Sequence, residues 1–231
     1  MISPRRAVGG PPLWLLAIVF TALFVAGLAV STAIAGGHTY PSPFSDASLI
    51  HGYFEQYRGA VLATGFFQFG AAIPLAIYAA TVSVRLRHLG VQAPGATIAQ
   101  VGGVLAAAFL ALSGLISWVL SRPEVVADPG LVRGLHDLGF AAGGVGHVVP
   151  LGLLIAGVAV PGWLARLLPR WLAFVGLAIA AVAELSTLAL LVPQLSVLLP
   201  TARFTALAWL ITVGFRLPRT RPRSEAVLVA D

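Results

Sequence analysis

Long apolar segments, separated by short stretches rich in proline, glycine and arginine, run through the whole chain. They lack the alternation of polar and apolar residues that a half-buried strand shows, and their length suits helices. A helix needs roughly 20 apolar residues to cross about 30 Å of hydrocarbon. The pattern predicts six membrane-spanning helices, at about residues 12–35, 58–82, 97–120, 133–159, 171–193 and 202–217.

Hydrocarbon offers the backbone no hydrogen-bond partner, so a spanning segment is either a helix or a strand of a closed barrel. Barrel strands are about ten residues long and alternate in polarity. The apolar segments of this chain are longer and do not alternate. We therefore predict an all-α fold, a polytopic membrane helical bundle. Its transmembrane domain covers residues 12–217, between an N-terminal segment 1–11 and a basic tail 218–231.

Composition supports a membrane protein and excludes several other classes. The chain is 58% hydrophobic and 10% charged, whereas soluble domains carry about 25% charged residues. It has no cysteine, which excludes disulfides, thiolate nucleophiles and cysteine-ligated metals. The net charge of +6 comes from arginines spread between the apolar segments rather than gathered on one face. We therefore expect membrane lipid, and no nucleic acid, as a partner.

The arginines are distributed unequally between the two sides of the membrane. Ten fall on one side, namely Arg5, Arg6, Arg85, Arg87, Arg166, Arg170, Arg216, Arg219, Arg221 and Arg223. The other side holds Arg58, Arg122, Arg133 and Arg203. Cytoplasmic loops carry the excess of basic residues, so both termini are predicted to be cytoplasmic. The use of arginine without any lysine or asparagine is typical of a G+C-rich bacterial genome, so we expect the bacterial inner (plasma) membrane.

The first apolar segment has a second interpretation. Arg5 and Arg6 precede it, and Ala33 with Ala35 resembles a signal-peptidase site, whose use would leave five helices. The apolar run exceeds the roughly 7 to 15 residues of a signal-peptide core. We therefore expect the first helix to be retained.

The connection after the first segment, residues 36–57, is the longest. Ser45 and Asp46 are placed to cap a short helix within it. The apolar residues of that helix recur at helical spacing, and they are Leu49, Ile50, Tyr53, Phe54 and Tyr57. We predict an amphipathic helix that lies at the membrane interface and leads into the second span.

The fourth segment carries three ionisable side chains in the stretch "LHDLGFAAGGVGHVVP". His136, Gly139, Gly143 and His147 are spaced by 3, 4 and 4 residues, which places them on one face of a helix. Gly139 and Gly143 form a small-xxx-small pair that lets another helix approach closely. The two histidines lie about 16 Å apart along the helix axis, so they cannot bind one metal ion.

Glu184 is an ionisable residue deep in the fifth apolar segment. Because His147 and Glu184 lie at nearly equal distances from the loop near residue 165, we predict that their side chains meet near the bilayer midplane, with Gln68 at a similar depth. One interpretation is a buried structural hydrogen bond, and the other is a site for a proton or a small ligand. His147, Glu184 and Gln68 are therefore candidate binding residues.

His136 and Asp137 complete the candidate set. We expect both near the outer surface, where water reaches them and Arg133 pairs with Asp137 one turn along the helix. A metal site of His38, His51 and His136 together with Asp46 or Glu55 is an alternative on the same side. The spacing of these histidines is irregular, and we predict no metal and no cofactor.

Catalytic signatures are absent from the chain, which has no G-x-S-x-G, H-E-x-x-H or P-loop pattern. Ser113 lacks the glycine that precedes a nucleophile, and we expect its hydroxyl to bond back to its own helix. Gly65 and Gly70 are predicted to be close-packing positions. We predict no catalytic residue.

Two stretches in the second half of the chain resemble a known family. Residues 167–181 read "LLPRWLAFVGLAIAA" and residues 202–217 read "ARFTALAWLITVGFRL". The matching positions are Pro169, Arg170, Trp171, Leu172, Trp209, Leu210, Ile211, Gly214 and Phe215. Over residues 131–217 the chain is similar to an uncharacterised family of bacterial six-helix membrane proteins. The resemblance implies the six-helix membrane fold and brings no substrate or catalytic residue.

The leading interpretation is an integral membrane protein without enzymatic activity that binds a small or lipidic ligand between its helices near His147 and Glu184. A small proton-coupled transporter that uses the same two residues is one alternative. A membrane-embedded enzyme or redox protein is the other.

The unequal distribution of arginine generates a test of topology. A reporter fused after residue 45 should report from outside the cytoplasm, and one fused at the C-terminus should report from the cytoplasm. A cytoplasmic signal from the first fusion would contradict the predicted orientation.

Overall fold

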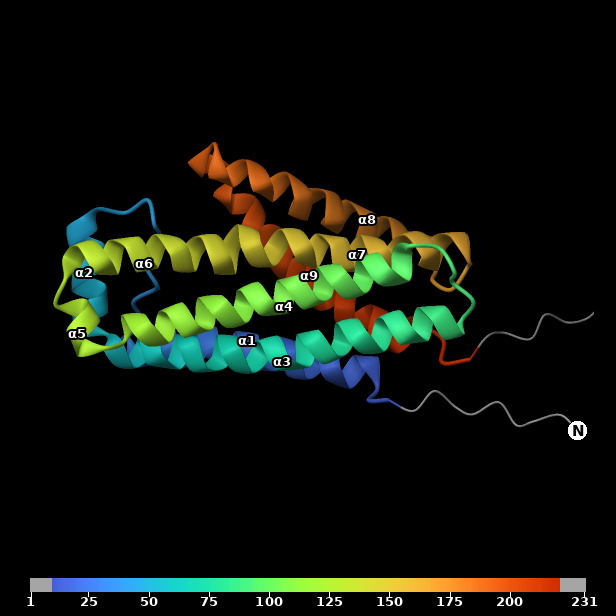
Figure 1. Ribbon diagram of the computed structural model, residues 1–231, viewed down its shortest axis with the longest axis horizontal. Helices are drawn as coiled ribbons and strands as arrows, with labels where there is room; N and C mark the ends of the chain where they lie inside the picture. Colours follow the sequence, from blue (N-terminus) through green and yellow to red (C-terminus); the bar gives the residue numbers. More distant parts are fainter. Residues whose placement is uncertain (1–9, 221–231) are drawn as a thin grey trace, which may run out of the picture.

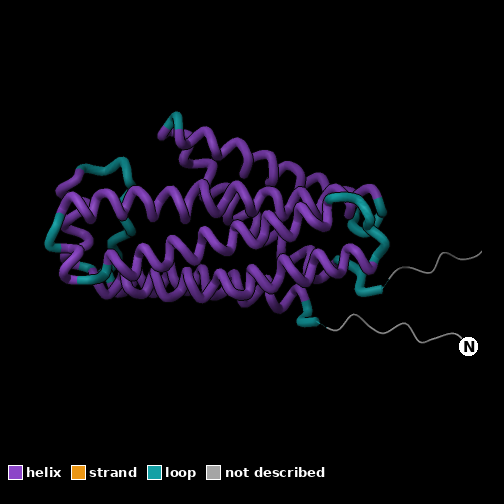
Figure 2. Tube along the Cα trace, viewed as in Figure 1, coloured by secondary structure: helices purple, strands orange, loops and turns teal. Residues whose placement is uncertain are grey.

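The computed structural model describes residues 10–220 of the chain. Over that range the chain is all-helical without a strand (Figure 2). Six of its helical segments are long and apolar enough to cross a membrane. The predicted all-α, six-helix membrane bundle is therefore confirmed. Residues 1–9 and 221–231, which hold four of the arginines used to predict the orientation, lie outside the described residues.

The helical segments run up and down along one long axis (Figure 1). The elements are α1 (Leu13–Ile34), α2 (Ala47–Gln56), α3 (Arg58–His88), α4 (Gly95–Leu120), α5 (Pro123–Val126), α6 (Pro129–Ala141), η1 (Ala142–Gly146), α7 (His147–Leu164), α8 (Arg170–Leu185), η2 (Ser186–Leu190), η3 (Pro193–Val197) and α9 (Leu198–Arg216). The fourth span is the continuous rod α6–η1–α7.

The two ends of the bundle differ. At one, which we call the capped end, residues 36–46, α2 and α5 lie across the helix ends (Figure 1). At the other, the terminal end, α1 begins and α9 ends. The short helix predicted after the first span is present as α2, and its apolar side chains Ile50, Tyr53 and Phe54 are buried against the bundle. Asp46 precedes α2, but its side chain makes no capping hydrogen bond.

The fourth span contains a widened turn at its centre. Asp128 caps α6 by accepting hydrogen bonds from the backbone of Gly130 and Leu131, so the span begins at Pro129 rather than near residue 133. η1 is a π-helical turn in which three of the five residues are glycine. Pro150, four residues after this turn, has no N–H to donate back to it. Single π turns within α-helices are frequent at functional sites.

The last span begins earlier than predicted. Its α-helix starts at Leu198, after the 3₁₀ turns of η3, rather than at residue 202. Pro200 lies in the first turn of α9, where its missing N–H costs no helical hydrogen bond. Arg203 is therefore five residues inside the helix instead of at its start.

Glycines let the backbones of neighbouring helices touch. A Cβ atom on Gly157 of α7 would lie 2.7 Å from the Gly95 carbonyl oxygen, and one on Gly65 of α3 would lie 2.7 Å from the Gly114 carbonyl oxygen. A Cβ on Gly139 would lie 3.3 Å from Ile116 of α4, and one on Gly143 would collide with the Ser113 hydroxyl. The predicted glycine seam of the fourth span is confirmed. The packing role predicted for Gly70 is wrong, because nothing lies within 4 Å of its Cβ position.

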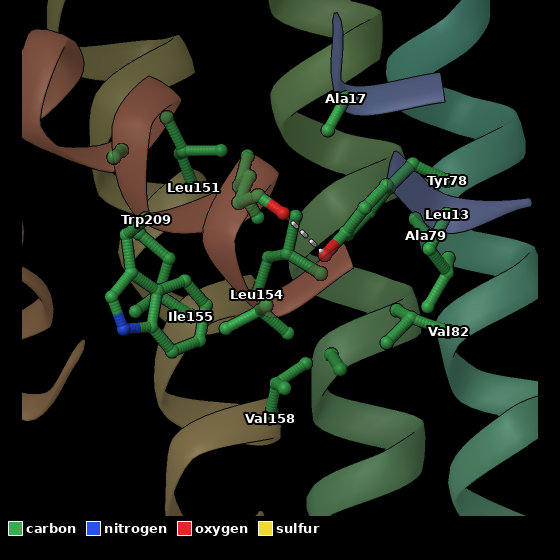
Figure 3. Close-up of a cluster of buried hydrophobic side chains, with 14 of the residues drawn as sticks. Leu13, Ala17, Tyr78, Ala79, Val82, Leu151, Leu154, Ile155, Val158 and Trp209 are labelled. Carbon is green, nitrogen blue, oxygen red and sulfur yellow. Dashed lines mark hydrogen bonds between the residues drawn. The ribbon is translucent and has the colours of Figure 1, made fainter. Parts of the chain in front are cut away.

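The terminal half of the bundle contains the largest apolar cluster (Figure 3). Two large aromatic residues extend into it with their polar atoms satisfied. The Tyr78 hydroxyl donates to the Leu210 carbonyl oxygen at 3.4 Å, and the Trp209 indole N–H donates to the Leu172 carbonyl oxygen at 2.9 Å. These two hydrogen bonds link α9 to α3 and α8 inside an otherwise apolar core.

The glycine contacts generate a stability prediction. Gly157→Ala should destabilise the protein by about 1–3 kcal/mol, because the added methyl group meets backbone atoms that cannot rotate away. Gly70→Ala is the matched control and should be neutral or stabilising by up to about 1 kcal/mol, since alanine favours a helix and the site is open. Thermal unfolding in detergent measures both. Equal effects of the two substitutions would contradict the packing described here.

Candidate functional site

His147 is the first residue of α7 and is completely buried. Its Nδ1 atom donates a hydrogen bond to the Ala106 carbonyl oxygen of α4, at 2.8 Å. A carbonyl oxygen only accepts, so the Nδ1 atom carries a proton. The opposite ring nitrogen, Nε2, is buried and has no hydrogen-bond partner among the described residues.

Glu184 does not contact His147, so the predicted pair is wrong. The glutamate lies on the exposed side of α8, and its Oε1 atom is 3.2 Å from the position that a Cβ on Gly152 would occupy. Counting residues from a loop sets the depth of a side chain in an antiparallel helix pair but not its direction around the helix. The buried face of α8 includes Ala180 and Ala183, and Glu184 lies at the edge of that face, about 40° from Ala180 and about 100° from Ala183.

Arg203 of α9, rather than Glu184, reaches the π turn at the centre of the bundle, and its side chain is partly buried. Its Nη2 atom donates to the Gly143 carbonyl oxygen in the π turn, and its guanidinium carbon lies 5.3 Å from the centre of the Phe24 ring of α1. The Nε atom is buried without a hydrogen-bond partner in the described part of the chain. The assignment of Arg203 to an outer loop is therefore wrong, because α9 begins before Pro200.

A chain of contacts places Gln68 and Ser113 at the depth of Arg203. The Ser113 hydroxyl donates to the Gly139 carbonyl oxygen at 3.1 Å, across two helices, and not back to its own helix as predicted. A Cβ on Gly114, the residue after Ser113, would lie 2.8 Å from the backbone nitrogen of Phe69, which follows Gln68. We call Gln68, Ser113, Gly143 and Arg203 the polar layer.

α1 contacts both α3 and α9 at the depth of the polar layer. A Cβ on Gly27 would lie 2.7 Å from the Cβ of Phe67, which precedes Gln68. Phe24, one turn before Gly27, makes a cation–π contact with the Arg203 guanidinium. The polar layer is thus surrounded by α1, α3, α4, the π turn and α9, all at one level of the bundle.

The polar layer separates two apolar clusters. The cluster of the terminal half reaches Leu110 on α4 and Ala71 on α3. The cluster beneath the cap begins at Ile116 on α4 and Val61 on α3. Ser113 and Gln68 lie between these limits on their helices. Along α3 and α4 the apolar core is therefore interrupted at one depth by polar groups, whereas a third apolar cluster, with Val145 of the π turn and Leu199 of α9, lies beside the interruption.

Five buried side-chain polar atoms have no hydrogen-bond partner among the described residues. They are Thr21 Oγ1, Gln68 Oε1, His136 Nε2, His147 Nε2 and Arg203 Nε. Those of Gln68 and Arg203 belong to the polar layer. His147 lies one helical turn after Gly143, and Thr21 lies one turn before Phe24. Buried polar groups are nearly always bonded, and each that is not costs about 1–3 kcal/mol. All five atoms except His136 Nε2 lie at the polar layer or about one helical turn from it, which indicates a place for a polar partner.

His136 and Asp137 lie at the capped end, separate from the polar layer. Arg133 pairs with Asp137 at 3.0 Å, as predicted. The Arg133 guanidinium also donates to the carbonyl oxygens of Pro43 and Ser45, which anchors the 36–46 segment onto α6. That segment covers His136, which is only 2% exposed. The prediction that water reaches His136 is therefore wrong.

Tyr40 of the covering segment packs over His136, with ring centres 5.6 Å apart. The residue keeps 37% of its surface exposed, and its ring also packs edge-on against Phe54. Burial raises the pKa of the Tyr40 phenol, and the Ser117 hydroxyl partly opposes that shift. Burial likewise raises the pKa of Tyr53. Both phenols therefore remain neutral at physiological pH, as suits a covering layer over the bundle end.

The histidines of the capped end are engaged separately. The His38 ring stacks on Tyr57, and His51 Nε2 lies 2.9 Å from the Val126 carbonyl oxygen. His136 lies beneath Tyr40 and Phe54. Residues 10–220 contain no group of three metal-ligating side chains close enough to share an ion. The alternative of a metal site made of these three histidines is therefore wrong within the described residues.

Comparisons of the chain with protein-family models, curated proteins and solved structures find no match. The resemblance to a bacterial six-helix membrane family over residues 131–217 stays a prediction.

The different environments of His147 and Glu184 generate a paired stability test. His147→Ala should cost about 2–4 kcal/mol, because it removes a buried ring and its hydrogen bond to α4. Glu184→Gln should change the free energy of unfolding by less than about 0.5 kcal/mol, since the side chain is exposed and unbonded. Unfolding in detergent measures both. A large loss from Glu184→Gln would restore a structural role for the carboxyl group.

Proposed function

We propose that the protein is an integral membrane binding protein that holds a small or lipidic ligand between its helices, at the polar layer. Three buried side-chain polar atoms without a hydrogen-bond partner in the described chain carry the proposal, and they are Gln68 Oε1, His147 Nε2 and Arg203 Nε. These atoms come from α3, α7 and α9, and the proposed ligand lies between these helices and bonds with them. Such a ligand would supply the hydrogen bonds that the described chain leaves unmade.

The same geometry favours binding over catalysis. Ser113, the hydroxyl of the polar layer, donates to the Gly139 carbonyl oxygen rather than to a base. The ring of His147 is fixed by its hydrogen bond to Ala106 of α4. A nucleophile needs a base within hydrogen-bond reach, and this pair does not form one. The transporter alternative depended on contact between His147 and Glu184, which the structure lacks.

The setting of the protein is part of the proposal. The distribution of arginine supports a bacterial inner membrane location with both termini in the cytoplasm. In that orientation the capped end faces outward. The sequence resemblance over residues 131–217 supports membership of the bacterial six-helix family. Membrane lipid would surround the bundle and would be the immediate source of a lipidic ligand.

Purification in a neutral detergent tests the proposal. The wild-type protein should retain a bound molecule that native mass spectrometry detects and organic extraction releases. Gln68→Met keeps the side-chain size and removes the amide group that Gln68 contributes to the polar layer. It should therefore reduce retention of the bound molecule about tenfold or more. Gln194→Met, at an exposed position of η3, is the matched control and should retain the molecule fully.

A wild-type protein that carries no molecule, and binds none when supplied with membrane lipid extract, would contradict the proposal. Equal retention by the Gln68→Met and Gln194→Met proteins would move the binding site away from the polar layer.

A further inference from the structure

Arg203 is a partly buried cation that has no acidic partner among the described residues. The ion pairs of the described chain are Arg122 with Glu124 and Arg133 with Asp137, both at the capped end. Arg203 instead donates one hydrogen bond to the Gly143 carbonyl oxygen and lies over the Phe24 ring. These contacts use one of its five N–H donors and provide no negative charge.

No acidic side chain of the described residues reaches this guanidinium. Five of the six lie in the loops, α2, α5 and α6 of the capped end, namely Asp46, Glu55, Glu124, Asp128 and Asp137. Glu184, the sixth, lies on the exposed side of α8 against Gly152. A cation in hydrocarbon is costly unless it is paired. An anionic partner for Arg203 would therefore come from outside the described chain.

The neighbourhood of Arg203 is open to the apolar phase on one side. α9 and α1 are close at the terminal end, where Trp14 stacks on Phe215, and they diverge toward the capped end (Figure 1). Beyond Phe24, α1 buries only Gly27 and Ser31, whereas Leu28, Val30 and Ile34 are exposed. Arg203 lies where the two helices part. An apolar chain lying along the exposed outer half of α1 would place its end at the guanidinium.

We propose that Arg203 binds an anionic oxygen headgroup, a carboxylate or a phosphate, on a molecule whose apolar tail lies along α1 beside α9. The inference rests on the proposed ligand-binding function and names the chemical class of the ligand. A planar guanidinium pairs with either headgroup through two parallel hydrogen bonds. The side-on pair of donors consists of Nε–H, which is unbonded, and one of the two Nη2 hydrogens, and Nη2 also donates to Gly143.

Three probes with the same twelve-carbon tail test the proposal on the wild-type protein. Dodecanoate, dodecyl phosphate and dodecanol are titrated into the purified protein in neutral detergent, and binding is followed by calorimetry and native mass spectrometry. At least one anion should bind about tenfold or more tightly than dodecanol. A preference for dodecanoate identifies a fatty-acid type of headgroup, and a preference for dodecyl phosphate identifies a phosphate.

Two variants locate the preference. Arg203→Gln should bring the anions to within about threefold of dodecanol, because the charge is removed while hydrogen-bonding capacity remains. Arg122→Gln removes an exposed arginine at the capped end and should leave all three affinities unchanged. The wild-type comparison needs no variant, so the proposal stays testable if Arg203→Gln does not fold.

The outcomes distinguish this inference from the proposed function. If all three probes bind equally to the wild type, and Gln68→Met weakens all of them, the anionic headgroup is refuted and the ligand-binding function stands. If no probe binds and no molecule co-purifies, both are refuted. An anion preference that survives Arg203→Gln would also overturn the assignment to Arg203.

Discussion

The hydrogen bond from Arg203 to the Gly143 carbonyl oxygen is the contact around which the middle of the bundle is organised. A helix in hydrocarbon normally makes all its backbone hydrogen bonds within itself. A side-chain donor from another helix reaches a backbone carbonyl oxygen only where the neighbouring side chains leave room. The π turn provides that room, because three of its five residues lack a Cβ atom. The arginine therefore depends on the glycines, and the glycines also allow the Ser113 hydroxyl of α4 to lie against Gly143.

The spans could be predicted from the sequence, but the interior could not. Hydropathy identified six helices because an apolar run of sufficient length has few other stable forms in a membrane. Gly139 and Gly143 were identified as a packing seam because their spacing fixes a common helix face. His147 was expected in the interior and is buried there, whereas Glu184 was placed on the wrong face. Depth follows from residue counts, but rotation depends on tertiary packing that no single helix encodes.

Arg203 was missed for a specific physical reason. The last span was predicted to begin at about residue 202, after Pro200, which left the arginine at the membrane surface. Proline is compatible with the first turn of a helix, and Val197, Leu198 and Leu199 before it continue the apolar run. Extending the helix backward through those residues would have placed the arginine inside the membrane. A charged residue inside a span is by default a functional candidate, so the sequence did contain the signal.

The unbonded atoms at the polar layer also bear on stability. Proteins are stable by about 5–15 kcal/mol, and each buried polar atom without a partner costs about 1–3 kcal/mol. Gln68, His147 and Arg203 together would therefore consume a large share of that margin in an empty bundle. Replacing them with apolar residues would remove this free-energy cost without changing the helices. These side chains therefore lower the stability of the empty bundle relative to an apolar core. A bound molecule offsets the cost, and because it binds only the folded bundle it raises stability as its concentration rises. The polar layer and its ligand would then act as one structural unit that joins the capped cluster to the terminal cluster.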